Sequence, residues 1–218
     1  MKLYFVRHGK TLWNMEGRFQ GAGGDSPLLE ESIEECEALG RYLAHIPFDA
    51  VYSSDLKRAK ETVRIINHQN KKPKIIHYTP ALREWQLGKL EGSKISTMTS
   101  IYPQQMKAFR HNLAKFNASM FEAESVYQTT QRVRDLVFSL RHKPFDNVLF
   151  IGHGANLTAS IRSLLGFTPA NLRRLGGLDN LSLTVLETNN FEEYSCLLWN
   201  DRSYLAEIPE EATAQQKS

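Results

Sequence analysis

The hydrophobic pattern divides the chain into short apolar runs and longer segments in which apolar residues recur every three or four positions. The first run, residues 3–6, stops abruptly at two polar residues, which is typical of a strand buried on both faces of a sheet. Similar runs predict further strands at residues 50–52, 74–78, 147–151, 181–186 and 194–199. Helical spacing predicts helices at residues 29–43, after Ser53 and Ser54 as N-terminal caps, at 126–140 and at 157–165.

The alternation of strands and helices predicts an α/β fold. One segment departs from it, because residues 85–125 are polar and rich in aromatic residues, with breaks at Gly88, Gly92 and Pro103. We expect this segment to form a small helical cap outside the sheet. Residues 209–218 show no periodicity, so we expect a flexible tail there and one domain over residues 1–208.

Composition narrows the classes of protein. With 218 residues, 41% of them hydrophobic, the chain can form one substantial core. No apolar run approaches the roughly 20 residues of a membrane span, and the run after Lys2 is too short for a signal peptide, so we expect a cytoplasmic protein without a membrane partner. The net charge is only +3 and basic residues are dispersed, which argues against nucleic acid as a partner. Cys36 and Cys196 lack metal-ligand spacing, and we expect two buried thiols.

Two of the predicted strands end in the same way. The stretches YFVRHG and LFIGHG each consist of a buried strand followed by a histidine and a glycine, at His8 and His153. Taken alone, His8 fits a satisfied structural histidine better than a catalytic one. However, polar residues at the carboxyl ends of strands in an α/β sheet converge on one crevice, so we expect the two histidines to face each other there.

Further polar residues near the strand ends favour a functional interpretation. Arg7 adjoins His8, Asn14 follows six residues later, and Arg58 begins a helix after another strand end. A pocket for a phosphoryl group explains all of them together with His153. Planar guanidinium groups match phosphate oxygens bidentately, and a protonated imidazole adds further charged donors.

The chain resembles the histidine phosphatase superfamily, also called phosphoglycerate-mutase-like, in four motifs that occur in the same order: LYFVRHGKTLWNMEGRFQG, VYSSDLKRAKET, LREWQLGKLEG and VLFIGHG. The resemblance covers roughly residues 1–166. It implies a three-layer α/β/α sandwich with a mostly parallel central sheet, a small helical cap insertion and a phosphohistidine intermediate.

The resemblance also implies roles for single residues, with His8 as the nucleophile and Glu84 as the acid and base. The expected catalytic residues are His8, Glu84, Arg7, Arg58 and His153, and the expected substrate contacts are Asn14, Gln20, Gly21 and Ala155. The sequence departs from the usual family pattern at Lys10, Ser32, Ala155 and Asn156. None of these departures affects an expected catalytic role.

The chemistry of these residue types supports the same roles. A neutral imidazole is a competent nucleophile if one ring nitrogen is held as a donor, and a tight turn at Gly9 allows a backbone carbonyl to hold His8 in this way. The two arginines and the second histidine would supply the positive charge that magnesium supplies in kinases, so we expect neither a metal nor a cofactor. Glu84 would protonate the leaving alkoxide and later activate water.

Other functions fit parts of the pattern. A phosphoglycerate-mutase-type phosphotransferase shares the chemistry, but the residues after Glu84, WQLG, are similar to the phosphatase branch. A phosphate-sensing or protein-binding module without turnover is a second alternative. A metal site formed by His8, His153 and Glu84 is a third, although two adjacent arginines would repel the cation. We therefore predict a phosphomonoester hydrolase of the histidine acid phosphatase type for a small phosphorylated substrate. The substrate's identity and the oligomeric state stay open.

Overall fold

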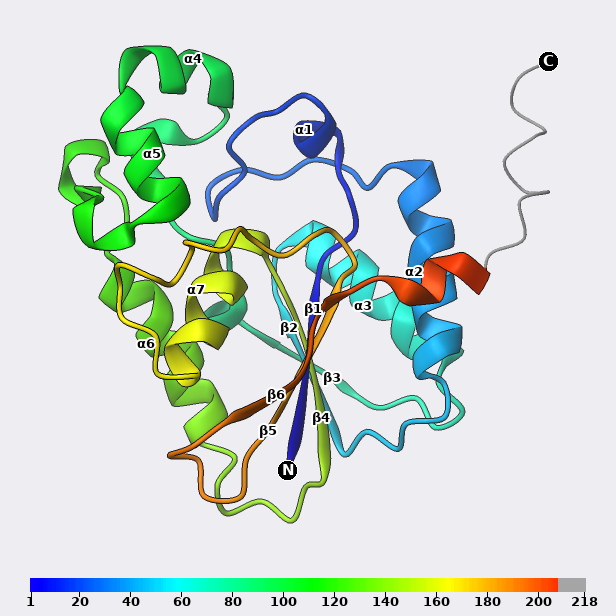
Figure 1. Cartoon of the computed structure of the whole chain (residues 1–218). Helices are drawn as coiled ribbons and strands as arrows, with labels where there is room; N and C mark the ends of the chain where they lie inside the picture. Colours follow the sequence, from blue (N-terminus) through cyan, green and yellow to red (C-terminus); the bar gives the residue numbers. More distant parts are fainter. Residues whose placement is uncertain (208–218) are drawn as a thin grey trace, which may run out of the picture.

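The computed structural model describes residues 1–207, in which a six-stranded sheet runs through the middle of the molecule (Figure 1). The strands are β1 Lys2–Arg7, β2 Ala50–Ser54, β3 Ile76–Thr79, β4 Asn147–Gly152, β5 Leu183–Glu187 and β6 Ser195–Asp201. They lie in the order β3-β2-β4-β1-β5-β6. The first four strands in this order are mutually parallel, whereas β5 runs antiparallel to β1 and β6 antiparallel to β5.

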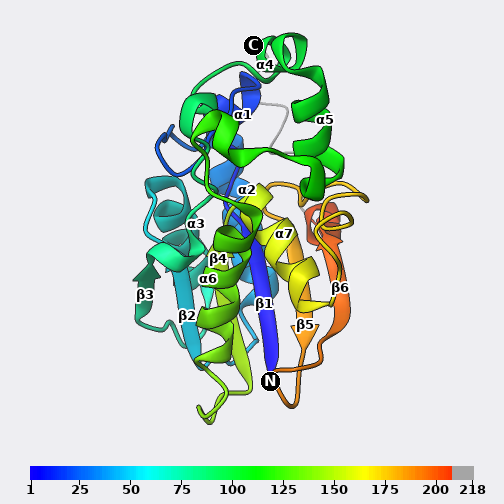
Figure 2. The same ribbon diagram turned by 90° about the vertical axis from the view of Figure 1, so that its left-hand side faces the viewer.

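Two pairs of helices cover the two faces of this sheet (Figures 1 and 2). Helices α2 Glu30–Leu43 and α3 Lys57–Gln69 pack on one face. Helices α6 Val126–Phe138 and α7 Gly154–Leu164 pack on the other. The predicted three-layer α/β/α sandwich with a mostly parallel sheet is therefore confirmed.

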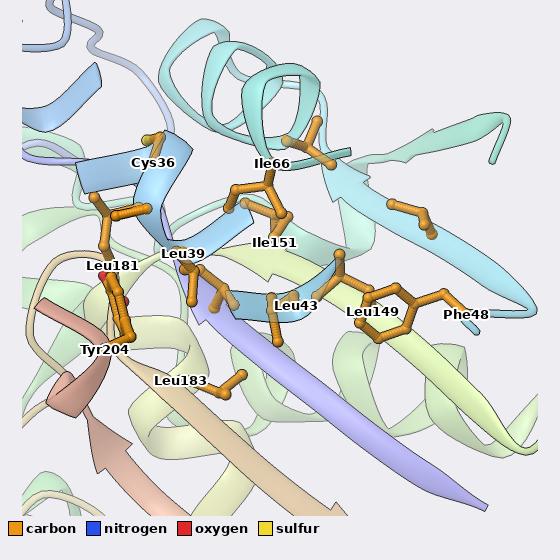
Figure 3. Close-up of a cluster of buried hydrophobic side chains, with 14 of the residues drawn as sticks. Cys36, Leu39, Leu43, Phe48, Ile66, Leu149, Ile151, Leu181, Leu183 and Tyr204 are labelled. Carbon is orange, nitrogen blue, oxygen red and sulfur yellow. The ribbon is translucent and has the colours of Figure 1, made fainter. Parts of the chain in front are cut away.

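Alternate side chains of β1 enter the two cores, which explains why its sequence is apolar at consecutive positions. Leu3 and Phe5 pack beneath α6 and α7, and Val6 joins the cluster beneath α2 and α3. Figure 3 shows the cluster beneath α2 and α3, in which Leu39 and Leu43 lie over the sheet residues Leu149 and Ile151. The central strand is thus fixed from both sides.

The predicted cap is a set of short helices at one end of the molecule (Figure 1). It contains α4 Ile95–Ile101 and α5 Pro103–His111, together with 3₁₀ turns at Gly88–Leu90, Leu113–Lys115 and Ala118–Phe121. It has an aromatic core of its own, with Trp85, Phe109 and Phe121 buried. The short helix α1 Leu12–Met15 lies at the same end (Figure 1).

Three local expectations were wrong. Ser53 and Ser54 are not helix caps, because the chain stays extended through Ser54 and α3 begins only at Lys57. Helix α7 begins at Gly154, three residues before the apolar period starts at Leu157. Cys36 is buried as expected, but Cys196 is exposed on β6.

Other features of the chain agree with the sequence, within the described range. Each of the other helices and strands for which the sequence predicted bounds lies within a few residues of them. No helix within residues 1–207 is long and apolar enough to cross a membrane. Residue 208, at the expected domain boundary, and the expected tail at residues 209–218 lie outside the described residues.

Candidate active site

The parallel register between β1 and β4 brings the two histidines together. Arg7 pairs with Gly152, so His8 and His153 each lie one residue beyond the pair. The backbone N–H of His8 donates to the Gly152 carbonyl oxygen over 2.9 Å. The two imidazole rings lie with their centroids 5.0 Å apart. The expected convergence of the two strand ends is therefore present, and both histidines are buried.

A backbone carbonyl fixes the tautomer of His8. Its Nδ1 lies 2.7 Å from the carbonyl oxygen of Gly9, and because a carbonyl only accepts, Nδ1 carries the proton. Nε2 is then the nitrogen with the free electron pair. Gly9 is closely packed, since a Cβ there would lie 2.8 Å from Oγ of Ser32. Ser32, one of the departures from the family pattern, accepts a hydrogen bond from the Lys10 amide over 2.6 Å.

His153 is held from the neighbouring strand. Its Nε2 lies 2.8 Å from the hydroxyl oxygen of Ser54 at the end of β2. Its Nδ1 is buried and has no hydrogen-bond partner within residues 1–207. Because buried polar atoms in folded proteins nearly always have a partner, this nitrogen indicates a ligand or a water at the site.

The surroundings of both histidines favour the neutral form. Burial lowers the pKa of His8 well below its ordinary value, and the positive charges of Arg58 and Arg7 lower it further. The pKa of His153 is lowered in the same way, first by burial and then by Arg58. The neutral imidazole is the nucleophilic form, so this arrangement suits His8 for attack on an electrophile.

Two arginines are anchored beside the histidines by backbone carbonyls. Arg7 donates from Nη1 to the oxygen of Leu178 over 2.6 Å. Arg58 donates from Nη1 to Gly24 and from Nη2 to Gly21, each over 2.9 Å, and its Nη1 lies 3.2 Å from a carboxylate oxygen of Asp25. The Nε atoms of both arginines are buried and have no partner within residues 1–207. Burial is the main cause that lowers the pKa of each guanidinium group.

Glu84 enters the site at the amino terminus of α7. Its Oε2 accepts a hydrogen bond from the amide of Ala155 over 2.9 Å. Its Oε1 accepts from the amides of Asn156 and Trp85 over 2.7 and 2.9 Å. The carboxyl group is thereby oriented by three backbone donors, and it caps a helix from a distant part of the chain.

The cavity at this end of the sheet has a volume of about 190 Å³. Six of the expected site residues line it: Arg7, His8, Asn14, Gln20, Glu84 and Ala155. Three others do not, namely Arg58, His153 and Gly21. The ring of His153 nevertheless lies beside that of His8, and the charge of Arg58 acts on both histidines. The amide of Gly21 donates to Oε2 of Glu91 over 2.9 Å instead of facing the cavity.

Glu91 ties the cap to the loop that holds Arg58. Besides Gly21, it accepts hydrogen bonds from the amides of Gly23 and Leu87, over 3.1 and 3.2 Å. A Cβ at Gly21 would overlap both Glu91 and the carbonyl of Trp85. The loop therefore presents its amides to Glu91 and its carbonyls to Arg58.

Three polar residues at the site were not expected from the sequence. Arg18 and Arg173 line the cavity. Asn180 donates to the carbonyl of His8 over 2.9 Å. All three come from loops, where no hydrophobic period shows which way a side chain points. Two aromatic residues also lie near the site: Phe19 lines the cavity, and Trp13 packs over Gly24.

Comparisons with known proteins agree with this geometry. The sequence model of the histidine phosphatase superfamily (branch 1) matches residues 3–202. The chain belongs to this superfamily. It is also 30% identical over 188 residues to the probable phosphoglycerate mutase GpmB of Erwinia tasmaniensis, a match that covers 86% of this chain and 85% of that protein.

Phosphatases of the superfamily are similar to the chain as well. Fructose-2,6-bisphosphatase TIGAR of Xenopus laevis is 43% identical over 98 residues, which are 44% of this chain and 36% of that protein. The structure of mycobacterial glucosyl-3-phosphoglycerate phosphatase with VO3 has a TM-score of 0.83 at 27% identity, covering 92% of this chain and 99% of the other. Bacillus stearothermophilus YhfR has a TM-score of 0.83 at 28% identity, covering 94% and 98%. The predicted family is confirmed.

The lowered pKa values of the histidines predict a pH dependence of stability. Unfolding returns each histidine to an ordinary pKa of about 6.5, so the unfolded chain binds more protons below that pH. The free energy of unfolding should therefore fall as the pH falls from about 7 toward 5. Urea denaturation at several pH values measures it. The dependence of the free energy of unfolding on pH should be weaker in His153→Gln than in the wild type. It should be unchanged in His142→Gln, which replaces an exposed histidine. Equal slopes in both variants would contradict a lowered pKa of His153 as the cause.

The contacts of Glu91 predict a loss of stability and activity in Glu91→Gln. Glutamine places an NH₂ donor where Glu91 accepts from backbone amides, so at least one partly buried hydrogen bond is lost, at a cost of about 1 kcal/mol. Activity should fall too, because the same loop holds Arg58. Glu122→Gln is the matched control, since Glu122 is an exposed acid of the cap paired with Lys89. Denaturation curves that coincide for the two variants would refute this role.

Proposed function

We propose that this protein is a phosphomonoester hydrolase that transfers the phosphoryl group of its substrate to Nε2 of His8 and then to water. The observation that carries the proposal is the fixed, neutral imidazole of His8 in a cavity beside two anchored guanidinium groups and a carboxyl group. A phosphohistidine requires this combination of a free ring nitrogen and positive charge around the phosphoryl oxygens.

The positive groups supply electrostatic stabilisation in this mechanism. As Nε2 of His8 forms a bond to phosphorus and the bond to the leaving oxygen breaks, negative charge spreads over the equatorial oxygens. The Nε–H groups of Arg7 and Arg58 are buried donors without partners within residues 1–207, and a phosphoryl oxygen would satisfy them. Asn14 adds its amide NH₂, since its Oδ1 already accepts from the Thr11 amide. His153 would add a further donor once protonated beside the bound anion.

Glu84 would act as the acid and then as the base. Its Oε1 accepts two hydrogen bonds and its Oε2 only one, so Oε2 is the oxygen with room for a proton. The proton passes to the leaving alkoxide, which departs as an alcohol. In the second half of the reaction, the carboxylate takes a proton from the water that attacks phosphohistidine, and inorganic phosphate is released.

The known relatives support a small phosphorylated substrate. Mycobacterial glucosyl-3-phosphoglycerate phosphatase and the fructose-2,6-bisphosphatase TIGAR are named for phosphate release from small phosphorylated molecules. These phosphatases favour hydrolysis over the mutase alternative, although GpmB is named a probable phosphoglycerate mutase.

The proposal includes activity without a metal, a cytoplasmic location, and no nucleic-acid or membrane partner. Within residues 1–207, no group of three or more His, Cys, Asp or Glu side chains is arranged to hold a metal ion. The alternative metal site at His8, His153 and Glu84 would also place a cation beside Arg7 and Arg58.

Trapping the intermediate tests the proposed function. The enzyme is mixed with a monophosphate ester that it hydrolyses, without added metal, and the reaction is quenched rapidly at alkaline pH. An acid-labile phosphoenzyme should be found in the wild type and in His142→Ala, but not in His8→Ala. Phosphate release should persist in chelator. Turnover by His8→Ala at more than a trace level, or activity that one divalent cation restores after chelation, would refute the mechanism. A non-catalytic module would give neither phosphoenzyme nor phosphate.

A product assay separates a phosphatase from a mutase. The enzyme is mixed with 3-phosphoglycerate and a trace of the bisphosphate primer, and both products are measured. Formation of 2-phosphoglycerate much faster than free phosphate would show that the mutase alternative is correct. Cleavage of nitrophenyl phosphate alone would leave the phosphatase proposal standing with another natural substrate.

The role of Glu84 predicts a dependence on the leaving group. Glu84→Gln should slow phosphorylation by sugar phosphates by about 10² to 10⁴-fold, but slow it much less with nitrophenyl phosphate, whose anion departs without a proton. The comparison is made within one variant, so any loss of stability from the changed cap of α7 cancels. Single-turnover kinetics measure this step apart from dephosphorylation. Equal losses on both substrates would make Glu84 a structural residue.

A further inference from the structure

A third arginine lines the cavity and has no role in the proposed phosphoryl transfer. Arg173 lies in the loop between α7 and β5. Its Nη1 donates to the carbonyl oxygen of Phe109 in α5 over 2.9 Å, and its guanidinium lies 4.7 Å from the centre of the Phe109 ring. It thus reaches the cavity from the side of the cap, whereas Arg7 enters from the end of β1.

The charge of Arg173 is only partly balanced by a carboxylate. Within residues 1–207 it forms no ion pair, and its Nε is buried without a hydrogen-bond partner. Burial lowers its pKa to about 10, which leaves the group positively charged at neutral pH. Glu84, which also lines the cavity, attracts it without forming an ion pair. A partly buried guanidinium group with an unpaired buried Nε–H gains stability from an anion that binds to it.

The other arginines of the cavity are already occupied. Arg7 faces the phosphoryl group in the proposed mechanism. Arg18 pairs with Glu16 and donates to the carbonyl of Gly92 over 2.9 Å. Arg173 is therefore the cavity arginine that is left for a second anion.

The walls between these charges are apolar. Phe19, Leu87, Ile95 and Phe109 line the same cavity of about 190 Å³. Such walls suit a short carbon skeleton that carries its charged groups at its ends.

We propose that the substrate is a small phosphate ester with a second anionic group, a carboxylate or another phosphate, and that Arg173 binds this second group. The inference rests on the proposed function, because it takes the first phosphate to lie at His8. If Arg173 only contacted Phe109, it would be a structural residue that joins its loop to the cap. A structural residue does not distinguish substrates that differ only in the second charge, whereas a residue that binds the second anion does.

Ligand binding to the wild-type protein gives the first test, independent of turnover. Calorimetry compares 3-phosphonopropionate with propylphosphonate, two non-hydrolysable compounds that differ in a carboxylate. The first should bind at least about tenfold more tightly, and Arg173→Gln should lose most of that difference. Equal affinities in the wild type would overturn the proposal.

Kinetics on matched substrates give the second test. The ratio of kcat/KM for 3-phosphoglycerate to that for glycerol 3-phosphate compares a carboxylate with a hydroxymethyl group. This ratio should fall about tenfold or more in Arg173→Gln. It should stay near the wild-type value in Arg174→Gln, which removes the same charge from the exposed neighbouring residue. A fall of kcat/KM by the same factor on both substrates would show that Arg173 has only a structural role.

The outcomes also separate this proposal from the proposed function. If no phosphoenzyme forms but the phosphonates differ in affinity as expected, the second-anion site is supported and the hydrolase mechanism is wrong. If the phosphoenzyme forms and the phosphonates bind equally, the hydrolase stands and the second-anion site is wrong. Arg173→Lys serves where Arg173→Gln fails to fold: because it keeps the charge, it should retain most of the preference for 3-phosphoglycerate, and complete loss of that preference in a folded protein would count against a charge-based role.

Discussion

The parallel pairing of β1 with β4 is the constraint on which the site depends. Both strands are buried on two faces, so a slip of one residue would turn Leu3 and Phe5 out of one core and Val6 out of the other. The register that packs these side chains also places His8 beside His153 at the end of the sheet. The geometry of the two imidazole rings is therefore set by hydrophobic packing far from the cavity. Local contacts, such as that between Nδ1 of His8 and the Gly9 carbonyl, then fix the orientation of each ring.

Around these rings, the protein concentrates positive charge and keeps it rigid. Arg7 and Arg58 are anchored to backbone carbonyls, which orient each guanidinium group, and only Arg58 also pairs with a carboxylate, that of Asp25. Burial lowers the pKa of both histidines, and the same charges lower it further, which keeps the imidazole rings neutral. A phosphate dianion would reverse this balance, because it neutralises the arginines and favours a proton on His153. In the proposed mechanism, the substrate anion thus balances the positive charge of the site and also helps to protonate His153.

The fold and most of the site could be predicted because both follow from strand ends. A buried run that stops at a polar residue shows where a strand ends, and His8, Arg7 and His153 all lie at such ends. The start of α7 could not be predicted, because Glu84 caps that helix from 70 residues earlier in the chain and local sequence carries no trace of it. Arg18 and Arg173 were missed for a related reason: they lie in irregular segments, and only the packing of the cap decides which loop arginines face the cavity. Cys196 is exposed because β6 lies at the edge of the sheet, and the apolar run around this residue did not show that position.

The position of Glu91 has a consequence for how such a protein can change its substrate. Two cap residues of the cavity wall, Ile95 and Phe109, follow Glu91 in the chain, whereas Leu87 and the loop that holds Arg58, which Glu91 contacts, precede it. Substitutions beyond residue 92 can therefore reshape this part of the wall while the loop that holds Arg58 keeps its contacts with Glu91. A cap transplanted from another member of the superfamily should be joined after Glu91. A junction before Glu91 would replace both the cavity wall and the residue that supports the loop around Arg58.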